Sequence, residues 1–377
     1  MHVGLNLIFL VPGETGGMEV AALELIAALV ADAPADLQLT LFVNQEAADA
    51  GGPWSDGSLP SVVVPIKATN RVEWVRGEQQ LLPGLAARAG CDLVHSLAST
   101  APLRGAFRRL TTIHDLNYAM VPDTHFGLRG LGMRALVPAA ARRSHRILVD
   151  AASTVEDLVQ VLGTPREKID VVPLGVRPPD ASVTPTTPLE LRTGLGLGGR
   201  RVLLSASAKR PHKNLLRLLD AHASLPADTR PVLVLPGYST PHEADLVARA
   251  AALGTTDDVR LPAWVSAADL EGLYALADAF VFPSLHEGFG LPVLEAMARG
   301  VPVVCSDRSS LPEVAGDAAL LVDPEDVGAL ASALTHLLDD GALRERLSAA
   351  GVERAAQFTW SRTADLTVQA YRRTLTA

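Results

Sequence analysis

The chain has 377 residues, a length that favours two domains over a single core. Hydrophobic residues make up 48% and charged residues 20%, which is typical of a globular protein and excludes a disordered chain. The formal net charge of −9 disfavours non-specific nucleic-acid binding, and no apolar run reaches the length of a membrane span, so we expect a cytoplasmic protein.

The first half of the chain alternates strand and helix patterns. An almost continuous apolar run over residues 3–11 predicts a buried strand, residues 12–17 form a glycine-rich turn, and residues 19–30 carry a helical apolar stripe. Further short strands are predicted at residues 37–43, 92–96, 110–115 and 146–150. This alternation predicts a doubly wound α/β domain with a parallel sheet, which we place at residues 1–180.

The second half repeats the alternation after a segment rich in proline, threonine and glycine, residues 177–199, whose first part we interpret as an interdomain linker. Strands are predicted at residues 201–207, 232–237, 259–265, 279–284, 301–307 and 319–324, and helices at residues 268–277 and 327–338. We therefore expect a second Rossmann-like domain at residues 181–377. Residues 358–377 carry a helical pattern and either pack on this domain or cross back to the first.

The stretch PSLHEGFGLPVLE, residues 283–295, follows a predicted strand and leads into a helix that begins at Pro292. Its glycine-rich turn therefore lies where open α/β sheets bind ligands and where free N–H groups attract anions. Because carboxylates repel phosphate, Glu287 and Glu295 are better suited to hydroxyl groups, and a nucleotide sugar offers both a diphosphate and hydroxyls. A surface loop with a helix-start acid is the alternative, and this stretch alone leaves both open.

A second stretch, residues 205–215, also joins a strand to a helix, and it contains Lys209, Arg210 and Lys213. Cations are unusual at a helix start, where the macrodipole favours acids. They could stabilise the negative charge that builds on a departing diphosphate. The alternative is a basic loop facing solvent.

Weaker candidates lie in the first half. The turn around Gly16 and Gly17 lacks a full dinucleotide fingerprint, so a plain tight turn is equally possible. His114 and Asp115 end a strand together, and either a structural or a functional role is open to them. His95 is a similar but weaker case. We find no His or Cys spacing typical of a metal site and expect none.

Arginines are concentrated between residues 101 and 146, where the acids are only Asp115 and Asp123. A solvated helix surface explains this bias. The alternative is a basic face toward a phosphate-bearing acceptor or toward an anionic membrane, which would make the protein peripheral at the inner face of the membrane. The two cysteines, Cys91 and Cys305, have apolar neighbours, so we expect them to be packed and not disulfide-bonded.

Together these motifs resemble the retaining glycosyltransferases of family 4. The match rests on the E-x7-E pattern from Glu287 to Glu295, on RPHKN at residues 210–214, and on the glycine loop and the IHD sequence in the same order. The resemblance covers nearly the whole chain and is strongest at residues 260–325. It implies a GT-B fold, in which two Rossmann-like domains face a central cleft, the N-terminal one binding the acceptor and the C-terminal one the nucleotide sugar.

The resemblance also implies roles for the charged residues. Arg210 and Lys213 would hold the donor diphosphate and support the leaving group. Glu295 would bind the ribose hydroxyls and Glu287 would orient the donor sugar. Many family members have an arginine earlier in this loop, near the position of Ala208, so the assignment of Arg210 is the less secure of the two cations.

The remaining implied contacts involve backbone and neutral groups. Gly16 and Gly17 would approach the diphosphate or the acceptor, and His114 would bond a sugar hydroxyl. The nucleobase would lie near residues 263–265, which include Trp264 and Val265. Backbone groups of the glycine-rich turn would contact the sugar and the phosphates: Gly288, Phe289, Gly290 and Leu291.

The implied reaction is transfer from a nucleotide sugar with retention at the anomeric carbon and without a metal or another cofactor. The acceptor hydroxyl would attack from the face of the leaving group, and a phosphate oxygen would take its proton. We expect a mannosyl donor, GDP-mannose, first, with UDP- or dTDP-sugars as alternatives. The acceptor is a glycan, a lipid-linked glycan or a small molecule. A catalytically silent protein that binds nucleotide sugars is the alternative of another class.

Overall fold

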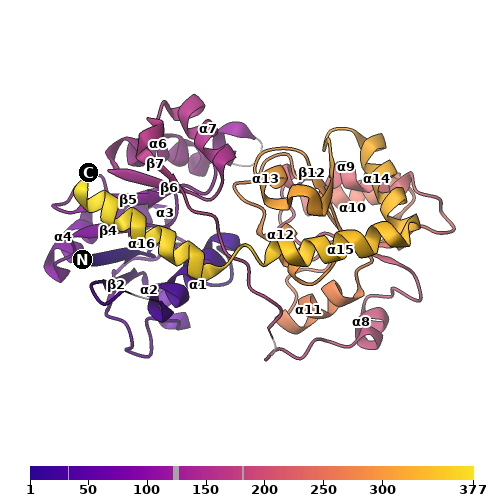
Figure 1. Ribbon diagram of the computed structural model, residues 1–377, viewed down its shortest axis with the longest axis horizontal. Coiled ribbons are helices and arrows are strands. Elements are labelled where there is room, and N and C mark those ends of the chain that lie inside the picture. Colours follow the sequence, from indigo (N-terminus) through magenta and orange to yellow (C-terminus); the bar gives the residue numbers. More distant parts are fainter. Residues whose placement is uncertain (33, 122–126, 181) are drawn as a thin grey trace. The chain divides into compact units, whose positions relative to one another are not determined.

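The computed structural model describes residues 1–32, 34–121, 127–180 and 182–377, with side chains omitted for residues 127–131 (Figure 1). Within these ranges the chain divides into two compact units. The N-terminal unit comprises residues up to 119, residues 127–175 and residues 359–377. The C-terminal unit comprises residues 176–358 together with residues 120–121. The chain thus passes to the second unit after Gly175, whereas the sequence placed the boundary after residue 180.

The N-terminal unit is built on a seven-stranded parallel sheet with the order β3-β2-β1-β4-β5-β6-β7. Its strands are β1 (His2–Asn6), β2 (Gln38–Val43), β3 (Ser61–Val63), β4 (Leu93–Ser96), β5 (Arg108–Thr112), β6 (Arg146–Val149) and β7 (Ile169–Val171). The predicted parallel sheet is confirmed. The short edge strands β3 and β7 were not predicted, because three residues carry too little periodicity to be recognised.

The strand predicted over residues 3–11 is wrong in its second half. β1 ends at Asn6, and the chain then turns, with the Leu10 N–H donating to the Leu7 carbonyl at 3.1 Å. The Asn44 amide donates to the carbonyls of Ile8, at 3.0 Å, and Leu10, at 2.6 Å. This turn is buried because its polar groups are satisfied by a side chain from another segment. Apolar composition alone could not separate a buried turn from a buried strand.

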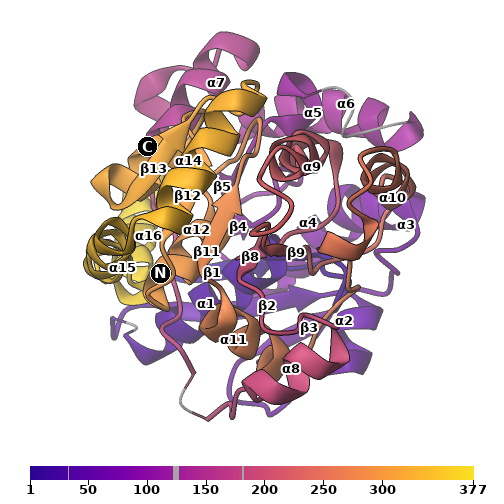
Figure 2. The same cartoon turned by 90° about the vertical axis from the view of Figure 1, so that its right-hand side faces the viewer.

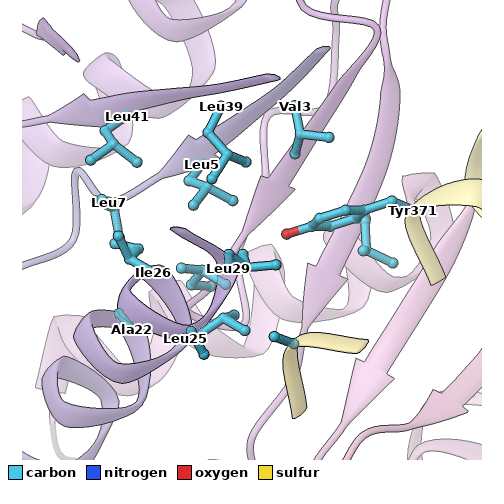
Figure 3. Packing of buried hydrophobic residues seen from close by; sticks show 14 of the residues in the cluster. Val3, Leu5, Leu7, Ala22, Leu25, Ile26, Leu29, Leu39, Leu41 and Tyr371 are labelled. Atoms are coloured by element: carbon cyan, nitrogen blue, oxygen red, sulfur yellow. The ribbon is translucent and has the colours of Figure 1, made fainter. Parts of the chain in front are cut away.

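Helices cover both faces of this sheet. They are α1 (Gly17–Ala31), α2 (Gln45–Ala50), α3 (Arg71–Arg76), α4 (Leu82–Ala89), α5 (Asn117–Met120), α6 (Gly127–Arg143), α7 (Ala152–Leu162) and α16 (Trp360–Thr376), with a π-helical turn at Gly77–Leu81. From the sequence, residues 358–377 could pack on either domain. The structure shows α16 packed on the N-terminal unit beside α1 (Figure 1). Tyr371 of α16 is fully buried and lies near Val3 and Leu29 in the core (Figure 3).

The C-terminal unit contains a six-stranded parallel sheet with the order β10-β9-β8-β11-β12-β13. Its strands are β8 (Val202–Leu204), β9 (Val232–Val234), β10 (Val259–Arg260), β11 (Ala279–Phe282), β12 (Val303–Ser306) and β13 (Ala319–Val322). Each predicted strand is present but shorter. The residues after each strand turn into loops at the carboxyl edge, where the ligand-binding segments of such sheets lie.

The helices of this unit pack on both faces of the sheet. They are α8 (Pro188–Gly194), α9 (Leu215–Ala223), α10 (Glu243–Ala252), α11 (Ala267–Leu276), α12 (Leu291–Ala298), α13 (Leu311–Ala315), α14 (Val327–Asp339) and α15 (Gly341–Ala355). α8 was not predicted, although Thr187 and Glu190 form a capping box at its start. Cys91 and Cys305 are both buried and free, as expected. Among the described helices, none is long and apolar enough to cross a bilayer.

Candidate active site

The candidate site of the C-terminal unit lies at the point where the strand order reverses. β8 and β11 are neighbours in the sheet, and the crossovers that follow them run in opposite directions (Figure 2). Loops at such a switch point diverge and leave room for a ligand at the carboxyl ends of the strands. The loop after β8 contains Arg210 and Lys213, and the loop after β11 contains Glu287. The two stretches singled out in the sequence are therefore neighbours in space.

Lys213 and Glu287 form a nearly buried ion pair. The Lys213 Nζ lies 2.6 Å from the Glu287 Oε1, and the two side chains are 13% and 11% exposed. The ammonium also lies 4.9 Å from the centre of the Phe282 ring. Burial alone would raise the pKa of Glu287, but the charges of Lys213 and His212 hold this pKa below its usual value. The pair is thus ionised and can exchange partners when an anionic ligand arrives.

Asn214 fixes the loop that carries Lys213. Its φ of 59° lies in the left-handed region, which asparagine tolerates better than most residues. The Asn214 amide donates to the carbonyl of Pro283, at 3.0 Å, and to that of Pro324, at 2.7 Å. The N–H of Leu285 donates in turn to the carbonyl of His212 at 2.8 Å. These bonds tie together the loops after β8, β11 and β13, so the cation is presented on a fixed backbone.

Two serines from the loop after β12 hold the turn that contains Glu287. The Glu287 N–H donates to the Ser309 Oγ at 2.9 Å. The Ser310 hydroxyl shares its hydrogen between the carbonyls of Glu287, at 3.0 Å, and Phe289, at 2.6 Å. Consequently the backbone of the turn is held rigid. These serines could not be predicted as site residues, because their role depends on a neighbouring strand that lies later in the chain.

The end of this turn is shaped by Phe289 and Gly290. The Phe289 ring is buried edge-to-face against Phe358, with 5.8 Å between ring centres, so only its backbone is available to a ligand. Gly290 has a φ of 116°, and a Cβ there would lie 2.6 Å from a methyl group of Leu311. α12 begins directly after it, at Leu291. Pro292 has no N–H, and the Val293 N–H donates to the Gly290 carbonyl at 3.0 Å. The amino end of α12 can therefore offer the Leu291 N–H to an anion.

Glu295 has different partners from Glu287. It lies on α12, where its Oε2 accepts a hydrogen bond from the Tyr274 hydroxyl at 3.3 Å. Arg299 donates to the Glu295 carbonyl at 3.0 Å, forms an ion pair with Glu271 and covers the Tyr274 ring. Burial raises the pKa of Glu295. The two acids of the E-x7-E pattern thus face separate surroundings, and Tyr274 is a contributor that the sequence did not reveal.

The three cations of the loop after β8 have distinct roles. Lys209 is fully buried, donates to the carbonyls of Gly237 and Pro262 at 2.9 Å each, and lies 3.3 Å from Glu243. It therefore braces the loops after β8, β9 and β10 and is not free to bind a ligand. Arg210 is half-buried, and its side chain forms no hydrogen bond or ion pair with any residue that the structure describes. Arg210 is thus the available cation beside Lys213.

Trp264 and Val265 lie in the segment after β10. Trp264 is 67% exposed and stacks on Tyr238, with 4.6 Å between ring centres and 27° between planes. Tyr238 follows β9, so two loops at the carboxyl edge contribute to this aromatic surface. The exposed Trp264 ring, supported by Tyr238, offers a flat apolar face to a nucleobase.

In the N-terminal unit, the strand order reverses between β1 and β4, and the glycine turn follows β1. Gly16 has a φ of 64° and precedes α1, while Gly17 is exposed at the helix start. Apart from the adjoining backbone, no atom of the described residues lies within 4 Å of a Cβ built on either glycine, so the backbone conformation of Gly16, and not lack of space, requires glycine there. Gly17 shows no such constraint, and its role in binding stays a prediction.

His114 is held on both sides. Its Nδ1 lies 2.7 Å from the Asp150 Oδ2, and its Nε2 lies 2.9 Å from the Leu97 carbonyl. Burial would lower the pKa of His114, but the charge and hydrogen bonds of Asp150, with the Leu97 carbonyl, raise it to about 9. In this structure both ring nitrogens are engaged, so neither is free for the sugar hydroxyl expected of it. The sequence did not identify Asp150, although it also ends a predicted strand.

His95, the weaker candidate, is a structural residue. It is fully buried, with its Nδ1 3.0 Å from the Tyr371 hydroxyl and its Nε2 2.8 Å from the Thr112 Oγ1. Burial lowers the pKa of His95 to about 3, so the ring is neutral. It ties α16 to the sheet. Among the described residues, no group of three or more His, Cys, Asp or Glu side chains is arranged to hold a metal ion.

Two family models match the chain. The model described as "Glycosyltransferase Family 4" matches residues 15–178, and the one described as "Glycosyl transferases group 1" matches residues 190–354. An O-antigen chain mannosyltransferase B from Escherichia coli is 34% identical over 268 residues, which is 70% of each chain. An MMP alpha-(1->4)-mannosyltransferase from Mycolicibacterium hassiacum is 33% identical over 66% of this chain and 58% of its own length.

Solved structures show the same fold. A sucrose-phosphate synthase from Thermosynechococcus elongatus superposes with a TM-score of 0.77 at 21% identity, covering 99% of this chain and 98% of its own. HepE from Anabaena in complex with UDP-glucose gives a TM-score of 0.77 at 20% identity, covering 99% and 100% of the two chains. The expected GT-B fold of two Rossmann-like domains is confirmed.

Proposed function

Because the chain belongs to glycosyltransferase family 4, we propose that it transfers a mannosyl group from GDP-mannose to a hydroxyl of a glycan, lipid-linked or small-molecule acceptor, with retention at the anomeric carbon and without a metal ion. The mannosyl assignment is supported by the two mannosyltransferases, each more than 30% identical to this chain. The glycosyltransferase activity is supported by the arrangement at the switch point of the C-terminal sheet.

One observation carries this proposal: Lys213 and Glu287 are paired at 2.6 Å between two loops, beside the amino end of α12. A diphosphate can take Lys213 and Arg210 as its cations and the Leu291 N–H at the start of α12 as a donor. Glu287, released from Lys213, can then accept hydrogen bonds from the hydroxyls of the sugar. The ion pair keeps both groups charged and in place until the donor binds.

Each other residue has a place in the same scheme. Glu295, held by Tyr274, accepts hydrogen bonds from the ribose hydroxyls, and the exposed Trp264 packs on the base. Two cations close to the diphosphate replace the charge that a metal ion would supply. The acceptor hydroxyl attacks from the face of the departing diphosphate, whose oxygen takes its proton. His114 is held as an imidazolium, so we expect it to act through position and charge and not as a general base.

A panel of nucleotides tests the donor. We expect GDP and GDP-mannose to raise the melting temperature of the protein, and UDP, dTDP and their sugars to leave it unchanged. A shift with UDP-glucose but not with GDP-mannose would contradict the mannosyl assignment and leave the glycosyltransferase activity standing.

A turnover assay separates the enzyme from a silent binding protein. Slow hydrolysis of GDP-mannose, or transfer to simple mannosides, is expected and should persist in EDTA. Proton NMR of the first product formed should show the anomeric configuration of the donor. Donor binding without hydrolysis or transfer to any acceptor would favour the silent protein, and inversion in the product would overturn the retaining mechanism.

A further inference from the structure

A group of cations lies at the amino-end edge of the N-terminal sheet. Arg108 and Arg109 are the first residues of β5, and α6 ends at Arg142 and Arg143, shortly before β6 begins. Lys168 directly precedes β7. Because β5, β6 and β7 are neighbouring parallel strands, these five residues share one edge. We call them the basic edge.

Acids neutralise only part of this region. Asp170 forms ion pairs with Arg146, at 2.5 Å, and with Arg373, at 3.1 Å. Its negative charge is therefore neutralised by these two arginines and not by the basic edge. Asp92 accepts a hydrogen bond from the backbone N–H of His2, and Glu167 is exposed. The side chains of the outer arginines form no hydrogen bond or ion pair with any residue that the structure describes: Arg108, Arg142 and Arg143.

The cations also repel one another. Burial, and then the charge of Arg143, lowers the pKa of Arg109. Burial likewise lowers the pKa of His145, and Arg108, Arg109 and Lys168 lower it further. A protein with a formal net charge of −9 therefore concentrates positive charge at one edge. Repulsion among these neighbouring positive charges destabilises the isolated unit, and an anionic partner would reduce this repulsion.

We propose that the basic edge docks the protein on a bilayer that contains anionic phospholipids, through Arg108, Arg142 and Arg143. A bilayer presents a flat, dense layer of phosphates that several separate cations can reach together, each adding to the attraction. This inference is independent of the identity of the donor sugar. It selects the membrane from the alternatives that the arginine-rich sequence left open.

Other anionic partners fit the edge less well. A specific phosphate site would need cations that are oriented by partners, whereas Arg108, Arg142 and Arg143 are unsupported. Single-stranded nucleic acid stacks its bases on aromatic side chains, and among the described large apolar residues the exposed aromatic one is Trp264, in the other unit. A long polyanion would also meet the net negative charge of the rest of the chain.

The placement also argues against a direct role in catalysis. Gly16 and His114 follow strands β1 and β5, so they lie at the carboxyl edge of the same sheet, at the opposite end of the strands. The separation is at least the length of a five-residue strand, about 16 Å. Docking by the basic edge therefore leaves the carboxyl edge of this unit open to the aqueous phase. It does not place that edge on the lipid surface.

Vesicle sedimentation tests the proposal with the full chain. We compare vesicles of phosphatidylcholine with vesicles in which half of it is replaced by phosphatidylglycerol. Binding should require the anionic lipid and weaken steeply when salt is raised to about 0.5 M, where charges are screened within a few ångströms. The triple variant Arg108→Glu/Arg142→Glu/Arg143→Glu should bind at least about 100-fold more weakly, since each cation near the surface contributes about fivefold.

A charge-matched control removes the effect of net charge. Arg76, Arg346 and Arg362 are exposed and belong to α3, α15 and α16, which contribute no residue to the basic edge, so Arg76→Glu/Arg346→Glu/Arg362→Glu should bind as the unchanged protein does, apart from a small loss. The milder Arg142→Gln/Arg143→Gln pair covers the case in which the first variant does not fold, and it should lose about 20-fold. Hydrolysis of the nucleotide sugar should be unchanged in all three variants.

Three results would overturn the proposal. The first is that the protein fails to sediment with anionic vesicles at low salt. The second is that both triple variants lose binding equally, so that net charge alone is responsible. The third is that single-stranded DNA binds the basic edge more strongly than the vesicles do. None of these outcomes bears on donor turnover, so the failure of this inference is distinguishable from the failure of the proposed activity.

Discussion

The carboxyl edges of the two sheets differ in how their polar groups are used. In the C-terminal unit, the Arg210 side chain forms no hydrogen bond or ion pair with any described residue, and Lys213 and Glu287 form an ion pair whose partners a ligand can replace. In the N-terminal unit, both nitrogens of His114 are engaged. Glu78 there is buried and accepts hydrogen bonds from Asn6, Thr100 and Gln79, and burial raises its pKa to about 7.

This difference separates binding from support. Groups with unused hydrogen bonds or exchangeable partners can receive a ligand without breaking the fold. Groups whose hydrogen bonds are all made inside a unit stabilise that unit. A ligand binds such a group only if its own hydrogen bonds are stronger than the ones it displaces. Sequence spacing marks both kinds of residue in the same way, since each ends a strand. The comparison therefore predicts that changes in the C-terminal unit alter catalysis and that changes at His114 alter stability.

The largest effect is expected for Lys213→Ala. It removes a cation from the departing diphosphate and leaves Glu287 buried without its partner, so kcat for donor hydrolysis should fall by about 10²- to 10³-fold. Arg166→Ala is the control, because Arg166 forms an exposed pair with Glu156 at 2.7 Å in the N-terminal unit and should change kcat by less than about twofold. Equal losses in the two variants would show that Lys213 has no special role.

Glu295→Ala should weaken the binding of GDP by about 100-fold, with a smaller change in kcat, because it removes charged hydrogen bonds to the ribose. Tyr274→Phe, which removes only the hydroxyl that orients Glu295, should weaken it by about fivefold. Calorimetry with GDP and 2′-deoxy-GDP sharpens the test. If Glu295 binds the ribose, both variants should discriminate less between the two nucleotides than the unchanged protein does. Unchanged discrimination would show that Glu295 does not bind the ribose.

The His114–Asp150 pair should make stability fall as pH rises. The folded pKa of His114, about 9, exceeds its unfolded value of 6.5, so the stabilisation is complete below about 6.5 and lost as pH passes 9. Burial raises the pKa of Asp150, and this cost of burying the carboxylate limits the stabilisation that the pair provides. Between about pH 7.5 and 9.5, where Glu78 is already mostly ionised, the free energy of unfolding should drop by up to about 2 kcal/mol.

Urea unfolding at both pH values measures this drop. Asp150→Asn should remove most of the pH dependence, whereas Asp228→Asn, an exposed acid in the other unit, should keep it. If Asp150→Asn reduced donor hydrolysis as strongly as Lys213→Ala but left the pH dependence intact, His114 would belong with the binding groups and the contrast between the two edges would fail.

The smallest effect is expected at Trp264. Trp264→Leu keeps an apolar side chain but loses the stack on Tyr238, so the affinity for GDP should fall by less than tenfold, corresponding to about 1 kcal/mol. Leu189→Ala, at an exposed site in α8, is the control and should leave the affinity for GDP unchanged. Trp54 cannot serve as a control because it is buried in the core. An unchanged affinity for every nucleotide would place the base elsewhere.

Much of the fold and of the C-terminal site could be predicted from the sequence. Alternating strand and helix patterns gave a parallel α/β architecture, and the turn at Glu287 followed from Pro292 at a helix start and glycines before it. These features depend on residues that are close in the chain. The partners of the site residues could not be predicted, because they come from elsewhere: Tyr274 from α11, Ser309 from the loop after β12, and Asp150 from the end of β6.

The sequence by itself determined the type of each domain, the loops that carry the chemistry, and the family. Only the tertiary structure decided which cation is free, since Lys209 and Arg210 are neighbours in sequence, yet Lys209 is buried against carbonyls and Arg210 is not. It also decided that α16 returns to the N-terminal unit, where Tyr371 meets His95. The physical reason is that burial and hydrogen-bond partners are set by residues far apart in the chain, which local patterns do not record.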